Sequence, residues 1–142
     1  MEQLAVGLGV PAEFHGWVGA SRRDELMRDT DLLAVPSLWP EPFGVVGQEA
    51  GAYGLPAAAY AVGGIPDWLK DGVNGHLAPG HPPTADGLAD AIVKCLGDHS
   101  HYGTLRRGAR AQTESAPDVA YHVASLIELL ERVGRRAGTV LL

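Results

Sequence analysis

The chain has 142 residues, of which 46% are hydrophobic and 20% are charged, and its formal net charge is -6. This length and apolar content suit one compact domain with a real core and leave little room for a second domain. The acidic balance provides no basic surface for a nucleic-acid backbone or an anionic membrane, so binding to nucleic acid is not expected.

Cysteine content and the N-terminal residues bear on the cellular compartment. Cys95 is the only cysteine, which rules out an internal disulfide and leaves no cysteine-and-histidine spacing typical of zinc. The N-terminus has no basic segment of a signal peptide, and the longest uncharged apolar stretch, residues 55–62, is too short to cross a bilayer. These features predict a cytoplasmic protein, and peripheral association of the full-length protein with a membrane stays open.

The first predicted elements are a strand, a helix and a second strand. The apolar stretch of residues 14–19 predicts a strand, and Ser21 with Asp24 forms a capping-box pattern that predicts a helix to about Arg28. Thr30 and Asp31 end that helix. The compact apolar run of residues 32–35 is typical of a buried parallel strand.

The middle of the chain alternates helices and strands separated by glycine turns. The predicted elements are a buried helix over residues 44–53, a strand over residues 56–62, a short helix over residues 65–69 and a strand over residues 76–78. Gly54 ends the first helix, and Gly63 and Gly64 form a tight turn after the strand. This order predicts an α/β fold, a Rossmann-like parallel sheet flanked by helices.

The remaining chain is predicted to be helical. Apolar periodicity predicts an amphipathic helix after Thr84 to about Leu96, a second over residues 102–114 and a third over residues 119–133. We expect these terminal helices to pack across one face of the sheet. Residues 1–133 then form the domain, and residues 134–142 are a flexible tail.

The loops after Val35 and Val62 are the predicted site, because ligands bind beyond the carboxyl ends of parallel strands. A helix starting at Gly44 would aim the backbone N–H groups of Phe43, Gly44 and Val45 at a ligand, an arrangement that attracts phosphate. The carboxylates of Glu41 and Glu49 would repel phosphate and instead accept hydrogen bonds from hydroxyl groups. The combination predicts a nucleotide sugar. The alternative is that Glu41 is a solvated loop residue, Glu49 a partner of the helix dipole and Gly44 a simple turn.

A series of motifs resembles a known family. In order they are Phe14-His15-Gly16-Trp17-Val18, the run from Pro36 to Gly44, Glu49-Ala50, Gly54-Leu55-Pro56, Gly63-Gly64 and Asp71-Gly72 before Gly75. Across roughly residues 8–97 the sequence is similar to the group 1 retaining glycosyltransferases of the GT-B fold. The resemblance implies a partial C-terminal lobe of such an enzyme, which binds the sugar donor.

The resemblance assigns roles to the matching residues. It implies that Glu41, the catalytic residue, bonds sugar hydroxyls and that Glu49 bonds the ribose. Pro42 belongs to the same donor-binding motif, and the amides of Phe43, Gly44 and Val45 contact the sugar and diphosphate. Trp17 and Val18 lie against the nucleobase. It further implies transfer with retention, a nucleoside-diphosphate sugar as donor, and no metal or other cofactor.

The sequence also departs from that family. The Arg and Lys that hold the diphosphate lie upstream of this sequence, and Arg22, Arg23 and Lys70 do not match them. The acceptor-binding N-terminal lobe and its histidine are absent, and Asp67 replaces a common Glu. We therefore expect a fragment or a truncated product that is inactive without the missing lobe.

Other polar and aromatic residues fit simpler roles. Three tryptophans, Trp17, Trp39 and Trp68, fall in predicted ligand-end loops, where stacking on a base or sugar and ordinary packing are equal alternatives. Ser37 has no nearby base that would make it a nucleophile. The residues predicted to be structural or solvated are His15, His76 and the group Arg106, Arg107 and Arg110. His99 and His101 fall in a predicted loop between helices and are too few for a metal site.

Two other functions compete with sugar transfer. One is a non-catalytic binding or oligomerisation module, whose exposed cleft face and sheet edge would be covered by the missing lobe or another chain. The weaker one is an epimerase of similar architecture, whose catalytic acids are not recognisable here.

Overall fold

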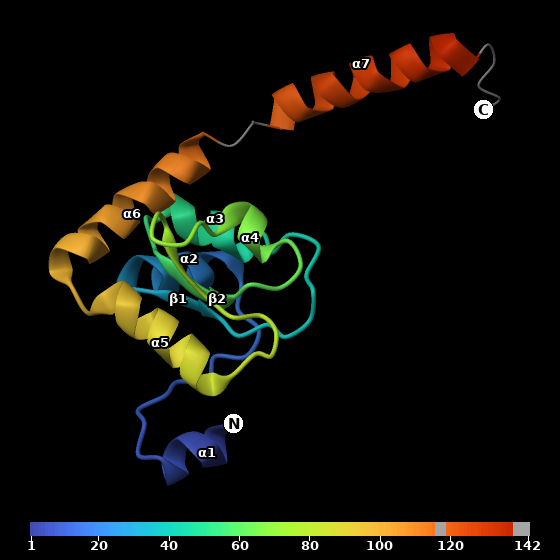
Figure 1. Ribbon diagram of the computed structural model, residues 1–142. Helices are drawn as coiled ribbons and strands as arrows, with labels where there is room; N and C mark the ends of the chain where they lie inside the picture. The colour runs from blue at the N-terminus through green and yellow to red at the C-terminus, as the bar shows by residue number, and fades with distance from the viewer. Residues whose placement is uncertain (116–118, 138–142) are drawn as a thin grey trace.

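The computed structural model describes residues 1–115 and 119–137, and the chain folds as alternating strands and helices (Figure 1). The elements in chain order are α1 (Glu2–Gly7), α2 (Ala20–Asp29), β1 (Leu33–Val35), α3 (Val46–Ala52), β2 (Ala57–Tyr60), α4 (Ile65–Trp68), β3 (Gly75–Ala78), α5 (Ala85–Leu96), α6 (His99–Glu114) and α7 (Val119–Ala137).

The three strands form one parallel sheet in the order β1-β2-β3, which confirms the predicted α/β fold. In the register of the sheet, Leu33 lies opposite Ala57, and Ala57 lies opposite Gly75. Gly75 has a φ of +155, and a Cβ at this position would collide with the backbone of Ala57. Glycine therefore sets how closely β3 approaches the central strand.

The central strand divides the core into two clusters. Every residue of β2 is buried, and successive side chains point to opposite faces. Ala57 and Ala59 pack with Ile65 and Trp68 on one face, whereas Ala58 and Tyr60 belong to the other cluster. The alanines are small enough for helices to lie close to both faces of the strand.

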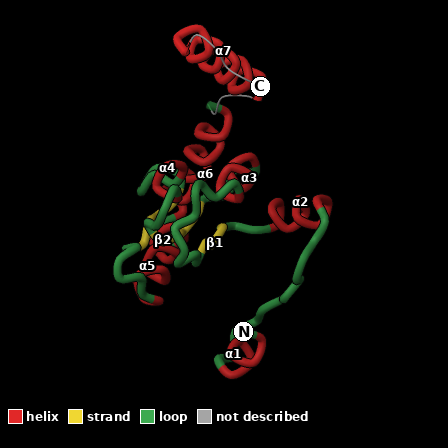
Figure 2. The backbone as a smooth tube through the Cα atoms, turned by 90° about the vertical axis from the view of Figure 1, so that its right-hand side faces the viewer, coloured by secondary structure: helices red, strands yellow, loops and turns green. Residues whose placement is uncertain are grey.

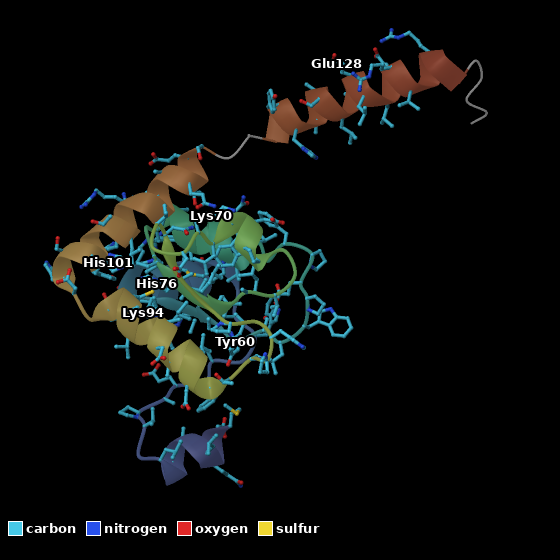
Figure 3. All side chains as sticks on the ribbon, in the orientation of Figure 1. Tyr60, Lys70, His76, Lys94, His101 and Glu128 are labelled. Carbon is cyan, nitrogen blue, oxygen red and sulfur yellow. The ribbon has the colours of Figure 1, made fainter. Side chains whose placement is uncertain are left out.

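The helix α5 covers the second face and is held at its first turn. It packs against β2 and β3, with Ala91 and Cys95 buried there. The Thr84 hydroxyl caps the helix by accepting from the Gly87 N–H at 3.1 Å, and the Tyr60 hydroxyl donates to the Thr84 carbonyl at 2.8 Å. Figure 3 shows Tyr60 at this end of the sheet. The predicted helix after Thr84 is confirmed.

The predicted first strand is wrong. Residues 14–19 have no regular structure, because Gly16 takes a φ of +61, which interrupts an extended chain. The capping box is also wrong, since the N-cap of α2 is Gly19 and Ser21 already lies inside the helix. Figure 2 shows this N-terminal segment as a long connection from α1 to α2.

The last helix does not pack across the sheet as predicted. Figure 1 shows α7 pointing away from the body, and its large apolar side chains are exposed. The sheet face is already closed by side chains of α5 and by Leu105 of α6. The helix continues to Ala137, four residues beyond its predicted end, and residues 138–142 of the predicted tail lie outside the described residues.

Among the described residues, none of the helices combines the length and apolar content needed to cross a membrane.

Candidate functional site

Two loops meet at the carboxyl edge of the sheet, as the sequence predicts. The loop after β1 carries Glu41, and the turn after β2 carries Gly63 and Gly64. The Gly64 N–H donates to the Glu41 carbonyl at 2.7 Å. A Cβ at Gly63 would collide with the backbone of Glu41, and a Cβ at Gly64 with that of Pro42. The two glycines therefore allow the loops to touch, and this contact fixes the backbone of Glu41.

Trp68 holds the two loops together. Its indole N–H donates to the Phe43 carbonyl at 2.6 Å, and the side chain is buried. The ring lies against Gly47 so closely that a Cβ there would collide with it. Packing is therefore the role of Trp68, whereas Trp17 and Trp39 are 94% and 77% exposed.

The helix after the first loop begins later than predicted. Gly44 has a φ of +87, in the left-handed region, so it cannot belong to a right-handed helix. Val45 is the N-cap, and α3 starts at Val46 rather than at Gly44. Within the described part of the chain, the N–H groups of Phe43, Gly44 and Val45 donate no hydrogen bond. The free amides are therefore present, in the turn that precedes the helix.

Glu41 is half-buried beside this turn. The Ser37 hydroxyl donates to its Oε1 at 2.5 Å. Its Oε2 faces Gly44, because a Cβ at Gly44 would lie 3.3 Å from that oxygen. This contact is not among those predicted from the sequence, although the four-residue spacing of Ser37 and Glu41 is a signal for it there.

Glu49 lies in the first turn of α3 and forms an ion pair with α2. Arg23 Nη1 donates to Glu49 Oε1 at 2.9 Å, with side chains that are 44% and 36% exposed. The two residues are 26 positions apart on different helices, so no local pattern in the sequence could have revealed the pair.

The predicted base-contacting segment lies outside the two loops in the sequence, and its contact with a base stays a prediction. Trp17 and Val18 lie in the irregular connection between α1 and α2. Among the described residues, no hydrogen bond, ion pair or ring contact joins either of them to Glu41 or Glu49.

Arg22 and Lys70, which like Arg23 do not match the diphosphate-binding positions of the family, have partners outside the two loops. Arg22 forms an ion pair with Glu25 of the same helix at 3.0 Å. The Lys70 ammonium donates to the Pro66 carbonyl at 2.6 Å. Among the described residues, neither forms a hydrogen bond or ion pair with the turn before α3.

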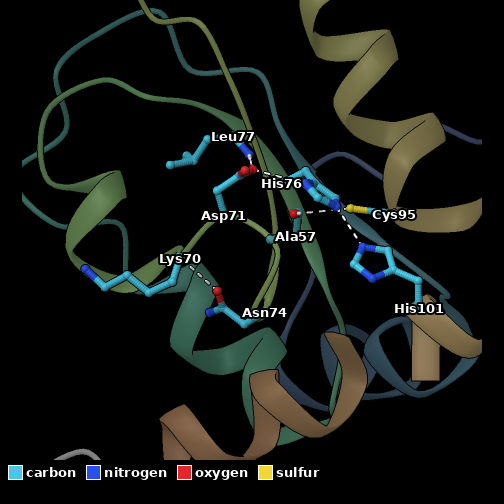
Figure 4. Close-up of polar contacts among 8 residues, drawn as sticks. All are labelled: Ala57, Lys70, Asp71, Asn74, His76, Leu77, Cys95 and His101. Carbon is cyan, nitrogen blue, oxygen red and sulfur yellow. Dashed lines mark hydrogen bonds and ion pairs between the residues drawn. The ribbon is translucent and has the colours of Figure 1, made fainter. Parts of the chain in front are cut away.

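A second polar cluster lies between β3 and α6, on the side of the sheet shown in Figure 4. His76 Nδ1 lies 3.0 Å from Asp71 Oδ1, and His76 Nε2 lies 2.9 Å from His101 Nε2. The Leu77 N–H and His76 both bond the Asp71 carboxylate and hold its pKa below the ordinary value. These contacts join a strand to a helix, so they fit the predicted structural role of His76 (Figure 3).

Asn74 closes the connection between α4 and β3. Its side chain is buried and accepts from the Lys70 N–H at 2.7 Å (Figure 4). It also donates to the Trp68 carbonyl at 2.8 Å. The described residues contain no group of three or more side chains that could hold a metal ion. Absence of a metal from the reaction stays a prediction.

A cavity behind α3 is not the predicted site. Its volume is about 10 Å³, and it is lined by Gly47, Gly51, Trp68 and Gln112 among other residues of α3, α6 and the sheet. A helix turns about 100° per residue, which places Glu49 on the side of α3 opposite to Gly47 and Gly51. No predicted site residue lines this cavity, which is too small for a nucleotide.

Comparison with known proteins identifies the family. The sequence profile described as "Glycosyl transferases group 1" matches residues 2–112. The D-inositol 3-phosphate glycosyltransferase of Xylanimonas cellulosilytica is 42% identical over 113 residues, which are 78% of this chain and 26% of that protein. The chain thus spans about a quarter of the length of this curated relative.

Solved structures agree with this result. The crystal structure of Anabaena Alr3699/HepE in complex with UDP and glucose is similar with a TM-score of 0.79 and 32% identity, covering 92% of this chain and 35% of that chain. The C-terminal domain of a group 1 family glycosyl transferase (LpcC) from Francisella tularensis has a TM-score of 0.70 at 21% identity, over 83% of this chain and 60% of that chain, a likeness of fold.

The fold therefore matches the C-terminal domains of GT-B glycosyltransferases, as the motifs predicted. The profile covers the sheet, both loops and most of α6, so the match includes every element that forms the candidate site. The chain belongs to the group 1 glycosyl transferases.

Proposed function

We propose that this chain supplies the donor-binding region of an enzyme that transfers a sugar, with retention, from a nucleoside-diphosphate sugar to an acceptor. Transfer requires an N-terminal lobe in addition. The observation that carries this proposal is the turn from Phe43 to Val45, whose N–H groups are unpaired among the described residues and lie between Glu41 and Glu49.

The charges of this arrangement favour a ligand with both phosphates and hydroxyls. Backbone N–H groups donate to phosphate oxygens without adding a side chain. Carboxylates repel phosphate but accept from hydroxyls, so Glu41 would bind the sugar and Glu49 the ribose. Each acid keeps one oxygen, Oε2, that accepts no hydrogen bond from any other described residue.

The same groups suit the chemical step. The bond between the anomeric carbon and the diphosphate oxygen breaks, and a bond to the acceptor oxygen forms on the same face of the sugar. The acceptor proton passes to the leaving diphosphate. The amides of Phe43, Gly44 and Val45 would stabilise the negative charge that grows on that leaving group, while Glu41 holds the sugar in place.

The relatives support this class of donor. The Anabaena protein has been crystallised with UDP and glucose and with UDP-glucose, and it shares 32% of its aligned residues with this chain. We therefore use UDP-glucose as the first probe, and GDP- and ADP-glucose as alternatives.

Titration calorimetry with these three sugar nucleotides tests the proposal. We expect at least one to bind the chain, and Glu49→Gln to weaken that binding, because the amide accepts hydroxyl hydrogen bonds less strongly than the carboxylate. The control is Glu114→Gln at the exposed end of α6, which should bind like the wild type. Failure of all three sugar nucleotides to bind the folded wild-type chain would contradict the proposal.

A second candidate function is self-association through α7. Val123, Leu126, Leu130 and Val133 are exposed and follow the three- and four-residue spacing of a coiled-coil seam. Such a spacing suits a helix as the partner, and a second copy of this chain offers the same seam. Glu128 lies outside this seam, on the helix that extends from the body (Figure 3).

Sedimentation equilibrium separates the two functions. Self-association predicts a dimer that Leu126→Glu together with Leu130→Glu converts to a monomer, whereas Glu128→Lys leaves it intact. A monomer at all concentrations contradicts the second candidate, and a dimer that binds none of the sugar nucleotides favours it over the first.

A further inference from the structure

Arg23 contacts one of the two acids of the candidate site from a separate helix. Its guanidinium donates to Glu49 Oε1 at 2.9 Å, and its other terminal nitrogen lies 3.8 Å from Asp24 Oδ1. The position of Arg23 is set by the start of α2, where its backbone N–H bonds the Gly19 carbonyl at 3.0 Å. The arginine is therefore held in the first turn of a regular helix.

The pair does not serve mainly to stabilise the fold. Both side chains are partly exposed, and ion pairs of this kind add little to stability. The helix α2 has no fully buried residue. Besides Arg23 with Glu49, the Arg28 guanidinium lies 5.6 Å from the centre of the Tyr53 ring.

The geometry leaves Glu49 able to bind a ligand. Arg23 occupies Oε1, whereas Oε2 accepts no hydrogen bond within the described part of the chain. A free glutamate side chain must be ordered when it binds a hydroxyl, which weakens binding. A glutamate already held through one oxygen avoids much of that loss.

We propose that Arg23 is a positioning residue for Glu49, and that it holds the carboxylate ready to accept the ribose hydroxyls of the nucleotide. This inference rests on the proposed function, in which Glu49 binds the ribose. It assigns to α2 a part in nucleotide recognition that lies outside the motifs of the two loops.

The test compares two nucleotides that differ only in the ribose. UDP carries both ribose hydroxyls, and 2′,3′-dideoxyuridine diphosphate carries neither. We expect the wild type to prefer UDP, and Glu49→Ala to remove the preference. Arg23→Ala should reduce the preference by about three- to tenfold, the effect of losing one favourable hydrogen bond. The affinity for the dideoxy nucleotide should not change.

Matched variants separate positioning from a general effect of charge. Arg22→Ala removes the neighbouring arginine, which pairs with Glu25 in the same helix, and should leave the preference unchanged. Arg23→Lys keeps the charge and should restore part of the preference. Arg23→Ala added to Glu49→Ala should have no further effect, because the two residues act through one carboxylate.

The outcomes distinguish this inference from the proposed function. If UDP binds and Glu49→Ala removes the preference while Arg23→Ala does not, the positioning role is wrong and the proposed function stands. Tighter binding of UDP by Arg23→Ala would mean that the arginine competes with the ribose, which also overturns the inference. If the folded wild type binds UDP and the dideoxy nucleotide equally well, Glu49 does not bind the ribose, and both its proposed role and the positioning by Arg23 fail. Circular dichroism of each variant confirms the fold.

Discussion

Trp68 donates its indole N–H to the Phe43 carbonyl at 2.6 Å and thereby joins the helix after β2 to the loop after β1. The contact spans 25 positions in the sequence. The Trp68 carbonyl also accepts from the Asn74 side chain, so Trp68 is tied to the start of β3 as well. The loop that carries Glu41 is thus anchored to the core through one buried side chain.

Trp68→Phe is expected to weaken both stability and nucleotide binding. The substitution leaves the Phe43 carbonyl without its donor, which costs about 1–2 kcal/mol of unfolding free energy. Urea unfolding measures this loss, and calorimetry measures the binding. Trp39→Phe, at a side chain that is mostly exposed, should change stability by less than about 0.5 kcal/mol. Equal effects of the two substitutions would contradict the anchoring role.

Gly63→Ala tests the close contact of the two loops. Gly63 and Gly72 both have positive φ, at +53 and +72, so alanine costs about 1–2 kcal/mol at either position. Only at Gly63 would the added Cβ also collide with Glu41, whereas Gly72 has open space around it. We therefore expect Gly63→Ala to be less stable than Gly72→Ala by about 1–3 kcal/mol in urea unfolding. Similar losses would show that the loops do not touch.

The elements close to the sheet could be predicted from the sequence, because their signals are local. The residues of β2 form an uninterrupted apolar run, and Thr84 followed by apolar periodicity marks the start of α5. The predicted start of α3 is two residues too early, because Gly44 takes a left-handed conformation. Gly44 packs near Trp68, whose Nε1 would lie 3.2 Å from a Cβ at this position. That contact comes from another part of the chain.

The candidate site was predictable in part for the same reason. The free amides before α3 and the position of Glu41 follow from the order of turn, helix and loop. The partner of Glu49 does not, because Arg23 is brought near it by packing of separate helices. The direction of α7 was also missed, since its amphipathic pattern shows that one face is apolar but not which surface covers that face.

Asp71 is expected to make stability depend on pH in the acidic range. The Leu77 N–H, followed by His76, holds the pKa of Asp71 below its ordinary value of 3.8. Because the folded pKa is the lower one, the ionised carboxylate stabilises the fold fully above the unfolded pKa, and this stabilisation is lost as the pH falls through the folded pKa. The unfolding free energies of the wild type and Asp71→Asn should therefore converge as the pH is lowered below 3.8.

Urea unfolding at several pH values measures this convergence. Asp90→Asn, at an exposed position of α5, serves as the control for the loss of a carboxylate. A constant difference between the wild type and Asp71→Asn at every acidic pH would show that the contacts with Leu77 and His76 do not favour the ionised form.

Cys95 reports on the packing of α5 against the sheet. Its side chain is fully buried, and burial raises the pKa of the thiol to about 11. At pH 8 only about one thiol in a thousand is ionised, and burial keeps a thiol-reactive reagent from reaching the sulfur. We expect no reaction with a disulfide reagent such as dithionitrobenzoate in the native state and complete reaction in urea. Rapid native reaction would show that α5 opens easily.

Ser37→Ala tests whether the serine hydroxyl orients Glu41. The hydroxyl donates to Glu41 Oε1 at 2.5 Å, and the other oxygen is free to accept from a sugar hydroxyl. Loss of this donor should weaken binding of UDP-glucose by about two- to tenfold while leaving binding of UDP unchanged, since Glu41 is proposed to contact only the sugar.

Calorimetry with UDP-glucose and with UDP gives the ratio of the two affinities directly. Ser37→Thr retains the hydroxyl and should bind like the wild type, and Ser125→Ala on α7 controls for a serine far from the loops. An equal loss for UDP and UDP-glucose would mean that Ser37 supports the whole loop rather than Glu41. A ratio that stays unchanged in Ser37→Ala, with wild-type affinity for both ligands, would show that Glu41 needs no partner to bind the sugar.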